Sequence, residues 1–560
     1  MKLSKKFFNK FEFIILPIIF IVSSFLFILP LMRQGVIYSG DDLSYHIERL
    51  NELYLNYQKQ NFYPLFATFG FNKIGYPVNI FYPWITLIPF VLIRLIIHNP
   101  VISIYLGIAF YSLLTMVFTY IVTRKVLAGK FQSCLTALIY CFCAYRSIDI
   151  FARFALGEYI SLTFYPLVFY GFYAVMFGNK KDWWYLGLGL SFILLSHVLS
   201  TFIICFVLFI LFICSVYFVT NFWSTIGALL KSVLLFSFSS CIFFVPFIEQ
   251  VSYQKYLQPS IDPLHLTRLT FSNLILESLN NNLNGALRTS GSTYNIGIVL
   301  FIVAIIGIFK FANWNPLYKA VYVIGVLSAL CSTNLIPWLT LERTPLSIIQ
   351  FPWRFLGLSS FMLSVSAGYI INDVYRSLTN KSKMLLTVLV PLCIVMPWFS
   401  GIQTFKIQEE AFMHVYNRYD NQLNGSLFLD QYIPETSQKS LSDLVSHTSI
   451  IDGKRLRIKD IKSSSNSLVF KNQYFKGAKT VILPLVSYKN ISVFQGNSEC
   501  KFHRNKNGLI VLDNVKRSMI SVVYRLSFLD KLAVFISIST WILMTLFIVI
   551  QFAHKKVKDQ

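Results

Sequence analysis

The sequence has little charge. Only 13% of the 560 residues are charged, whereas 55% are apolar and the mean hydropathy is +0.59. This balance argues against a soluble enzyme and is typical of a polytopic membrane protein. The formal charge of +24 is then no sign of a nucleic-acid partner, because Lys and Arg collect in the cytoplasmic loops of membrane proteins.

Paired cysteines, repeats and a cleavage site are also lacking. The nine cysteines show no paired spacing and all but Cys500 lie in apolar runs, which indicates neither a disulfide framework nor a zinc site. No repeat of fixed period and no low-complexity tract is evident. A basic start, Met1 to Phe11, precedes an apolar run that is too long for a signal peptide and has no small-residue cleavage site behind it. We expect an uncleaved first helix with a cytoplasmic N-terminus.

Long apolar runs alternate along the chain so that every strongly basic short loop, such as 123–130, falls on the cytoplasmic side. The run 80–98 is apolar enough to span, but counting it would move these loops outside, so we expect it to lie in the outer interface. About 12 transmembrane helices and a cytoplasmic C-terminus result. The expected spans are 13–32, 101–122, 131–145, 159–177, 183–199, 201–220, 224–248, 296–311, 317–331, 355–374, 384–401 and 532–553.

This topology divides the chain into five segments. A cytoplasmic N-terminus with the first span (1–32) precedes a first extracytoplasmic loop with interfacial helices (33–100). The multi-span core (101–401) includes an outer loop at 249–295. Residues 402–530 form an extracytoplasmic domain whose alternating β-prone runs predict an antiparallel β-sandwich, with strands near 480–485, 491–494, 509–512 and 519–524. A last span and a basic tail (531–560) end the chain.

The first outer loop carries the most polar stretch near the membrane, from Ser39 to Trp84. Helical spacing predicts a helix from about Asp42, with apolar residues on one face and Asp42, His46 and Arg49 on the other. A solvated polar face on an interfacial helix is an equally good interpretation, and an acidic residue in a first helical turn is favourable without any catalysis.

Three further outer motifs carry charge. They are FARFALGEY with Arg153 and Glu158, SHVLS with His197, and QFPWRFL with Arg354. Each has an ordinary explanation, since Arg153 and Glu158 can pair with each other, a histidine at a helix end is usually structural, and an arginine beside a tryptophan is a common interfacial anchor.

The topology nevertheless places all these groups on the side of Asp41 and Asp42. Fixed guanidinium groups beside a bilayer suit a lipid phosphate, and a carboxylate can deprotonate an incoming hydroxyl. This is the chemistry of sugar transfer from a polyprenyl-phosphate carrier. Asp41 and Asp42 are also candidate ligands for a divalent cation, Mg²⁺ or Mn²⁺, although an adjacent pair alone is a weak signal.

The motif order GDD..YHIER, FGFNKIGYPVNIFYPW, ARFALGEY..LTFYPLVFYGFY, LLSHVLS and QFPWRFL resembles the bacterial membrane proteins labelled 6-pyruvoyl-tetrahydropterin-synthase-related. It also resembles YfhO-type proteins and, more distantly, the GT-C class of integral-membrane glycosyltransferases. The resemblance implies a GT-C-like helical core with the acidic catalytic residue at Asp41 or Asp42, a lipid-phosphate-linked sugar donor and a C-terminal β-domain.

We therefore expect a glycosyltransferase of the bacterial cytoplasmic membrane that transfers a sugar from a polyprenyl-phosphate donor to an envelope glycopolymer or glycolipid on the outer face. Asp41 and Asp42 are the expected catalytic residues. The expected substrate-binding residues are His46, Arg49, Arg153, Glu158, His197 and Arg354. Two alternatives remain: a transporter or flippase of lipid-linked saccharides, which would place ionisable groups near the midplane on broken helices, and a non-catalytic envelope scaffold.

Overall fold

The computed structural model describes residues 11–38, 40, 42–127, 129–258, 269–284, 293–408, 429 and 431–558. The chain forms two compact parts. The first part comprises Met1–Leu43, Leu92–Ser232 and Ile261–Tyr419, and the second comprises Ser44–Val91, Val233–Ser260 and Asp420–Gln560.

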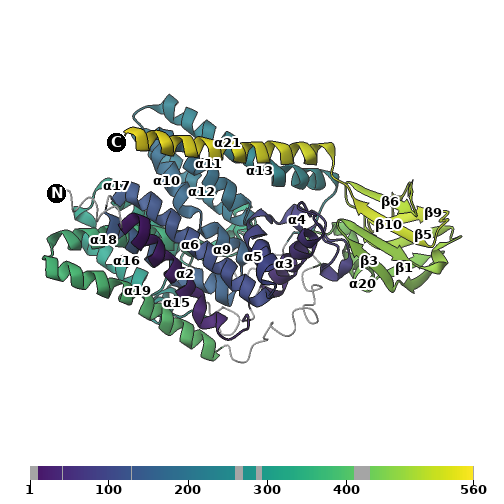
Figure 1. Ribbon diagram of the computed structural model, residues 1–560, viewed down its shortest axis with the longest axis horizontal. Coiled ribbons are helices and arrows are strands. Elements are labelled where there is room, and N and C mark those ends of the chain that lie inside the picture. Colours follow the sequence, from purple (N-terminus) through teal and green to yellow (C-terminus); the bar gives the residue numbers. More distant parts are fainter. Residues whose placement is uncertain are drawn as a thin grey trace. The chain divides into compact units, whose positions relative to one another are not determined.

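Most of the chain is helical, as the sequence predicts. Within the described residues, eight helical stretches are long and apolar enough to cross a membrane, and a ninth candidate is a broken pair with a 45° bend. This confirms a multi-pass membrane protein. The eight stretches contain α2 (Leu16–Met32), α6 (Pro100–Leu127), α9 (Leu156–Leu162) with α10 (Tyr165–Met176), α12 (Val198–Ser215), α13 (Phe222–Tyr253), α18 (Phe355–Ser377), α19 (Asn380–Gln408) and α21 (Phe528–Lys558) (Figure 1).

The broken pair joins α7 (Lys130–Cys141) to α8 (Ala144–Ser147) and the π-helix η4 (Ile148–Ala152). The remaining three predicted spans are helices of 12, 13 and 16 residues, which are α11 (Trp183–Leu194), α16 (Ile298–Lys310) and α17 (Pro316–Cys331). A full span needs about 20 residues, so the total of 12 stays a prediction. The predicted interfacial run 80–98 contains only the short helices α4 (Val78–Phe81), η3 (Ile85–Leu87) and α5 (Ile88–Ile97).

Small residues allow the short helix α11 to pack closely in the first part. A Cβ atom on Gly171 of α10 would lie 2.2 Å from the backbone nitrogen of Leu186 in α11. Likewise, a Cβ atom on Gly189 of α11 would lie 2.9 Å from the backbone nitrogen of Val168 in α10. Close backbone approach through glycine is a usual way for helices to associate in membranes, where the hydrophobic effect contributes little.

The second part contains the predicted antiparallel β-sandwich, which is confirmed (Figure 1). One sheet has the strand order β2-β1-β5-β9-β8 and the other β3-β4-β10-β6-β7. Its strands are β1 (Thr448–Ile451), β2 (Lys454–Arg457), β3 (Asp460–Ser464), β4 (Ser467–Lys471), β5 (Thr480–Val486), β6 (Ile491–Gln495), β7 (Ser498–Cys500), β8 (His503–Arg504), β9 (Leu509–Asp513) and β10 (Met519–Tyr524).

Alternation of apolar and polar residues builds this sandwich, because successive side chains of a strand point to opposite faces. In β10, Ile520, Val522 and Tyr524 are buried between less buried neighbours. The four runs predicted from sequence correspond to β5, β6, β9 and β10. The second part also contains the predicted helix of the first outer loop, α3 (Leu43–Gln58).

Candidate functional site

Buried charges of the first part meet around Arg153. This residue follows the π-helix η4, which places Asp149 one turn before it. The Arg153 Nη1 atom lies 2.8 Å from Asp149 Oδ1 and 3.1 Å from Glu158 Oε2. All three side chains are buried, so these pairs are shielded from water and from salt.

A second arginine reaches the same carboxylate from a distant segment. Arg354 ends the short helix η11 (Pro352–Arg354), and its Nε atom lies 3.2 Å from Glu158 Oε2. Its Nη1 atom donates to the carbonyl oxygen of Ile349 at 2.8 Å. Tyr145 donates its hydroxyl to Glu158 Oε1 at 2.5 Å. Arg354 is only 7% exposed, so it is not the exposed interfacial anchor that its tryptophan neighbour could indicate.

Aromatic rings surround the two guanidinium groups. The Tyr294 and Trp353 rings stack with centroids 4.4 Å apart, and Phe351 stacks on Trp353 at 4.7 Å. The Cζ atom of Arg153 lies 5.7 Å from the Tyr294 centroid, and that of Arg354 lies 4.8 Å from the Phe351 centroid. These cation–π contacts add attraction for the cations in a site with little water. The QFPWRFL motif thus contributes to this charged cluster.

His197 is tied to the cluster through hydroxyl groups. It is the N-cap residue of α12, where its Nδ1 atom accepts from the backbone N–H of Ser200 at 3.2 Å and lies 2.7 Å from the Ser200 hydroxyl. Ser161 bonds to the Ser200 hydroxyl at 3.0 Å and to the carbonyl oxygen of Glu158 at 2.7 Å. His197 therefore caps the N-terminus of α12, and its role in binding substrate stays a prediction.

The loop that follows α2 meets this cluster through its backbone. The N–H of Asp42 donates to the carbonyl oxygen of Arg153 at 3.0 Å. A Cβ atom on Gly40 would lie 2.7 Å from backbone atoms of Ala152 and Arg153, so only glycine fits there without a shift. Asp41 lies outside the described residues. Asp42 is half-buried, and within the described ranges no group of three or more His, Cys, Asp or Glu residues could hold a metal ion.

His46 and Arg49 belong to the second part and are buried there, so the alternative interpretation of a solvated polar face does not hold for these two residues. The Arg49 Nη2 atom donates to the carbonyl oxygens of Tyr82 and Pro83 at 3.2 and 2.7 Å, and its Cζ atom lies 4.1 Å from the Tyr82 centroid. The His46 ring lies 5.8 Å from the Tyr82 ring. Arg49 thus holds the chain at 82–83, and its expected contact with phosphate stays a prediction.

Two members of the buried cluster were not among the residues predicted for the site. Asp149 pairs with Arg153, and its spacing of four residues before an arginine was the available signal. Arg146 lies one turn before Asp149 and is fully buried. None of its three guanidinium nitrogens has a hydrogen-bond acceptor within the described residues, and its Cζ atom lies 4.6 Å from the Tyr159 centroid.

Two carboxylates of α3, Glu48 and Glu52, were also not among the residues predicted from the sequence. The Glu52 carboxylate accepts from the backbone N–H groups of Thr68, Phe69 and Gly70 at 2.7–2.9 Å. Glu48 accepts from Phe71 N–H at 2.7 Å. Burial, with a smaller contribution from the neighbouring Glu52 charge, raises the pKa of Glu48 to about 7, and the hydrogen bond from Phe71 opposes this rise. Both carboxylates thus fix the turn at 68–71 through its backbone N–H groups.

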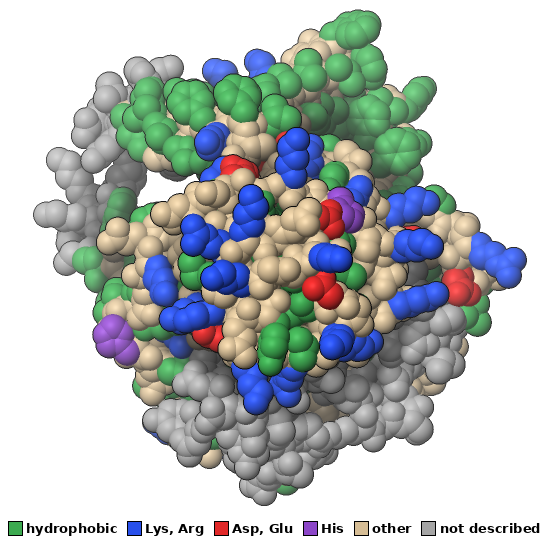
Figure 2. Space-filling model, turned by 90° about the vertical axis from the view of Figure 1, so that its right-hand side faces the viewer, with side chains coloured by type: hydrophobic (Ala, Val, Ile, Leu, Met, Phe, Trp, Pro, Cys, Tyr) green, Lys and Arg blue, Asp and Glu red, His purple; other side chains and the backbone are tan. Residues whose placement is uncertain are grey.

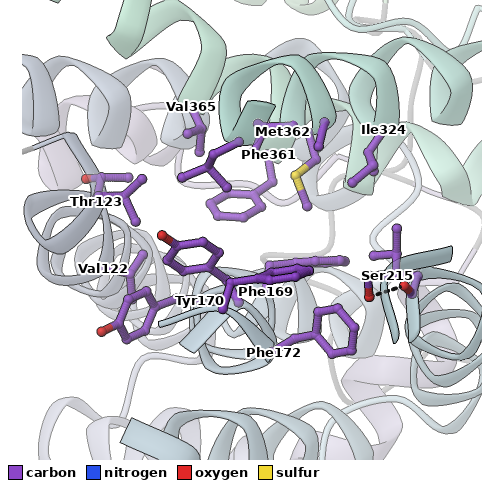
Figure 3. A pocket seen from close by; sticks show the side chains of 17 residues that line it. Val122, Thr123, Phe169, Tyr170, Phe172, Ser215, Ile324, Phe361, Met362 and Val365 are labelled. Atoms are coloured by element: carbon purple, nitrogen blue, oxygen red, sulfur yellow. Dashed lines mark hydrogen bonds between the residues drawn. The ribbon is translucent and has the colours of Figure 1, made fainter. Parts of the chain in front are cut away.

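A separate cavity of about 180 Å³ lies among the helices of the first part (Figure 3). Its lining is almost entirely apolar, with Phe169, Phe172, Phe361 and Met362 pointing into it from α10 and α18. It also contacts Leu211, which is roughly 20 Å along α12 from His197. The cavity therefore suits hydrocarbon, and no Asp, Glu, His, Lys or Arg is among its lining residues.

No family model and no curated protein matches the sequence. Solved structures resemble it distantly. The arabinofuranosyltransferase AftD from Mycobacteria is 11% identical with a TM-score of 0.42, and the match covers 71% of this chain and 27% of AftD. The Archaeoglobus fulgidus oligosaccharyltransferase is 11% identical with a TM-score of 0.41, covering 76% of this chain and 60% of that enzyme. The chain thus spans less than two thirds of either protein.

Proposed function

We propose that this chain is an integral-membrane glycosyltransferase, with a GT-C-like core of the YfhO type that its motifs resemble. It transfers a sugar from a polyprenyl-phosphate donor to a glycopolymer or glycolipid on the outer face of the bacterial cytoplasmic membrane. The single observation that carries the proposal is the hydrogen bond from Asp42 N–H to the Arg153 carbonyl oxygen. It brings the acidic first loop to a buried set of guanidinium groups.

The charges of this cluster favour an anionic ligand. Three guanidinium groups, on Arg146, Arg153 and Arg354, stand against two carboxylates, on Asp149 and Glu158. A buried cation without a counter-charge is costly, so an anion at the cluster would relieve the excess. A lipid phosphate supplies such an anion, and guanidinium groups match its oxygens in geometry.

The proposed reaction needs a base and a stabilised leaving group. Asp42 or Asp41 takes the proton of an acceptor hydroxyl, whose oxygen attacks the anomeric carbon of the donor sugar. The bond between that carbon and the phosphate oxygen breaks with its electron pair on the phosphate. Arg153 and Arg354 then stabilise the charge that develops on the phosphate. Glu158 orients both guanidinium groups, and His197 supports Glu158 through Ser200 and Ser161.

The test compares envelope glycans of cells that carry the unaltered protein, Asp42→Asn or Asp41→Asn at matched membrane levels. Asp373→Asn is the control, because Asp373 is an exposed carboxylate paired with Lys310. We expect one of the loop variants to abolish a sugar decoration while the control retains it. Normal decoration in both loop variants would overturn the catalytic assignment.

One observation favours transport as a second candidate function. The helix pair of 130–141 and 144–152 is broken, and its second limb carries the buried Arg146 and Asp149. Broken helices with buried charges are typical of transporter binding sites. In proteoliposomes, a flippase would move a lipid-linked saccharide between leaflets without cleaving its sugar–phosphate bond. A transferase would release the lipid phosphate in the presence of an acceptor.

A further inference from the structure

The β-sandwich is strongly basic. Residues 448–527 contain 15 Lys and Arg but only 4 Asp and Glu. Figure 2 views the molecule from the side on which Figure 1 draws the strands, and Lys and Arg dominate the charged side chains of that face. Such an excess is not needed for folding, because a sandwich is held by its apolar core. An excess of positive charge on this surface instead attracts anionic molecules.

Six of these cations gather where the strands end, and we name them the tip patch. The connections β4–β5 and β9–β10 bond to each other, with Gly477 N–H donating to Val515 O at 2.8 Å and Asn514 N–H donating to Lys479 O at 2.7 Å. The β1–β2 turn lies beside them, since Asp452 N–H donates to Thr480 O at 2.9 Å. The members of the tip patch are Lys454, Lys471, Lys476, Lys479, Lys516 and Arg517, and all six are exposed.

Acidic neighbours neutralise the tip patch only in part. Asp460 lies opposite Lys471 in the ladder, Asp452 accepts from the Thr480 N–H, and Asp513 pairs with His503. Within the described part of the chain, no tip-patch side chain takes part in an ion pair. Other cations of the sandwich do, such as Arg525 with Glu499. The tip patch therefore keeps a net positive charge.

The opposite end of the sandwich is attached to membrane helices of the same part. Glu249 of α13 lies 3.6 Å from Lys489 Nζ, and it accepts from Asn490 at 2.9 Å and from Ser527 at 3.0 Å. Ser527 immediately precedes α21. The seven residues of β5 lead from the tip patch to this attachment, which is a distance of roughly 20 Å. Dissolved salt screens exposed charges over about 8–10 Å. Charged lipid headgroups at the attached end therefore contribute little to the electrostatic potential at the tip patch.

We propose that the tip patch binds a linear polyanion of the cell envelope, a glycopolymer with repeating phosphodiester or carboxylate groups. Resting on the proposed function, we assign this polymer as the acceptor of the transferred sugar. Five of the six cations are lysines, which act as point charges and do not select planar carboxylates over phosphates. Recognition is then mainly electrostatic and weakens steeply as salt rises.

The test uses the full-length protein in nanodiscs of zwitterionic lipid. The probes are long-chain inorganic polyphosphate, polygalacturonate and neutral dextran, each titrated at two salt concentrations. The tip variant carries Lys476→Gln, Lys479→Gln, Lys516→Gln and Arg517→Gln. A control with the same charge change carries Lys439→Gln, Lys462→Gln, Lys501→Gln and Lys506→Gln, which are exposed but lie outside the tip patch.

We expect the tip variant to bind at least one polyanion about tenfold more weakly or worse, with a shallower salt dependence. The control should bind nearly as the unaltered protein does. Preference for polyphosphate or polygalacturonate would identify the anionic group. Equal weakening in both variants, or equally tight binding of neutral dextran, would overturn the proposal.

The loop variants Asp41→Asn and Asp42→Asn separate this inference from the proposed function. Whichever of them abolishes sugar transfer should still bind polyanion as the unaltered protein does. Loss of transfer without any polyanion binding by the unaltered protein would leave the transferase proposal intact and overturn the tip-patch assignment. Polyanion binding together with full transfer activity in both Asp41→Asn and Asp42→Asn would overturn the catalytic assignment of the loop and leave the tip-patch assignment intact.

Discussion

The backbone N–H of Asp42 and the carbonyl oxygen of Arg153 are joined by a hydrogen bond of 3.0 Å, across more than 100 residues of sequence. The Arg153 side chain binds Asp149 and Glu158. One residue thus anchors the acidic loop through its backbone and the buried cluster through its guanidinium group. Any movement of the segment around Arg153 is expected to move the acidic loop with it.

Replacing Gly40 by alanine tests this attachment. The added Cβ atom would lie 2.7 Å from backbone atoms of Ala152 and Arg153, which cannot rotate away as a side chain can. We expect the acidic loop to shift and sugar transfer to fall at least tenfold, at a stability cost of roughly 1–3 kcal/mol. Transfer is measured with the envelope-glycan comparison at matched protein levels.

Gly227→Ala is the matched control, because a Cβ atom there meets nothing within 4 Å. It lies inside α13, where alanine is a better helix former than glycine. Transfer and stability should stay at or slightly above the level of the unaltered protein. Full transfer activity in Gly40→Ala would show that the attachment is not needed.

Glu158→Gln is expected to destabilise the first part. It leaves Arg153 and Arg354 buried with less counter-charge, and removing one partner of a buried ion pair costs roughly 3–5 kcal/mol. Asp373→Asn, at an exposed pair, should cost no more than about 1 kcal/mol. Thermal unfolding of both variants in the same detergent makes the comparison, and equal midpoints would contradict a central role for Glu158.

Stability should fall as pH rises from about 5 to 7. Burial raises the pKa of Glu48 to about 7 in the folded protein, whereas an ordinary glutamate titrates near 4.5. Between these values the folded state holds a proton that the unfolded state has lost, so raising the pH favours unfolding, by roughly 3 kcal/mol at most. Burial also raises the pKa of Glu52, which acts in the same direction.

Glu48→Gln keeps an oxygen for Phe71 N–H and removes this titration. Unfolding midpoints measured from pH 5 to pH 8 should therefore depend less on pH in the variant than in the unaltered protein. The remaining slope belongs to the other buried titratable groups, of which Glu52 is one. Identical slopes in both proteins would show that Glu48 does not titrate in this range.

Arg49→Lys separates two roles of this side chain. A lysine keeps the charge but cannot reproduce the planar guanidinium that bonds to the carbonyl oxygens of Tyr82 and Pro83 and stacks on Tyr82. We expect a loss of about 1–3 kcal/mol in stability with little change in the KM for the donor. A raised KM at unchanged stability would instead favour phosphate binding by Arg49.

Local patterns in the sequence predicted the elements but not their burial. The strands at 480–486 and 519–524 and the helix at 43–58 follow from periodicity alone, because side-chain direction repeats every 2 or 3.6 residues. The same helical spacing left a solvated face for His46 and Arg49 open as an alternative, and the burial of both side chains rules it out. A helix face that is polar in sequence can be buried when backbone carbonyls elsewhere satisfy its donors, as those of Tyr82 and Pro83 do.

The sequence by itself determined a multi-pass membrane chain with a β-sandwich and the motifs that carry its charges, because composition and periodicity are local properties. Only the tertiary structure decided which charges meet. Arg354 reaches Glu158 across 196 residues, and Asp149 and Arg146 enter the cluster through the bend at 142–143. Such pairing depends on how helices pack and where they break, and it follows from the summed contacts of the whole chain rather than from any one stretch.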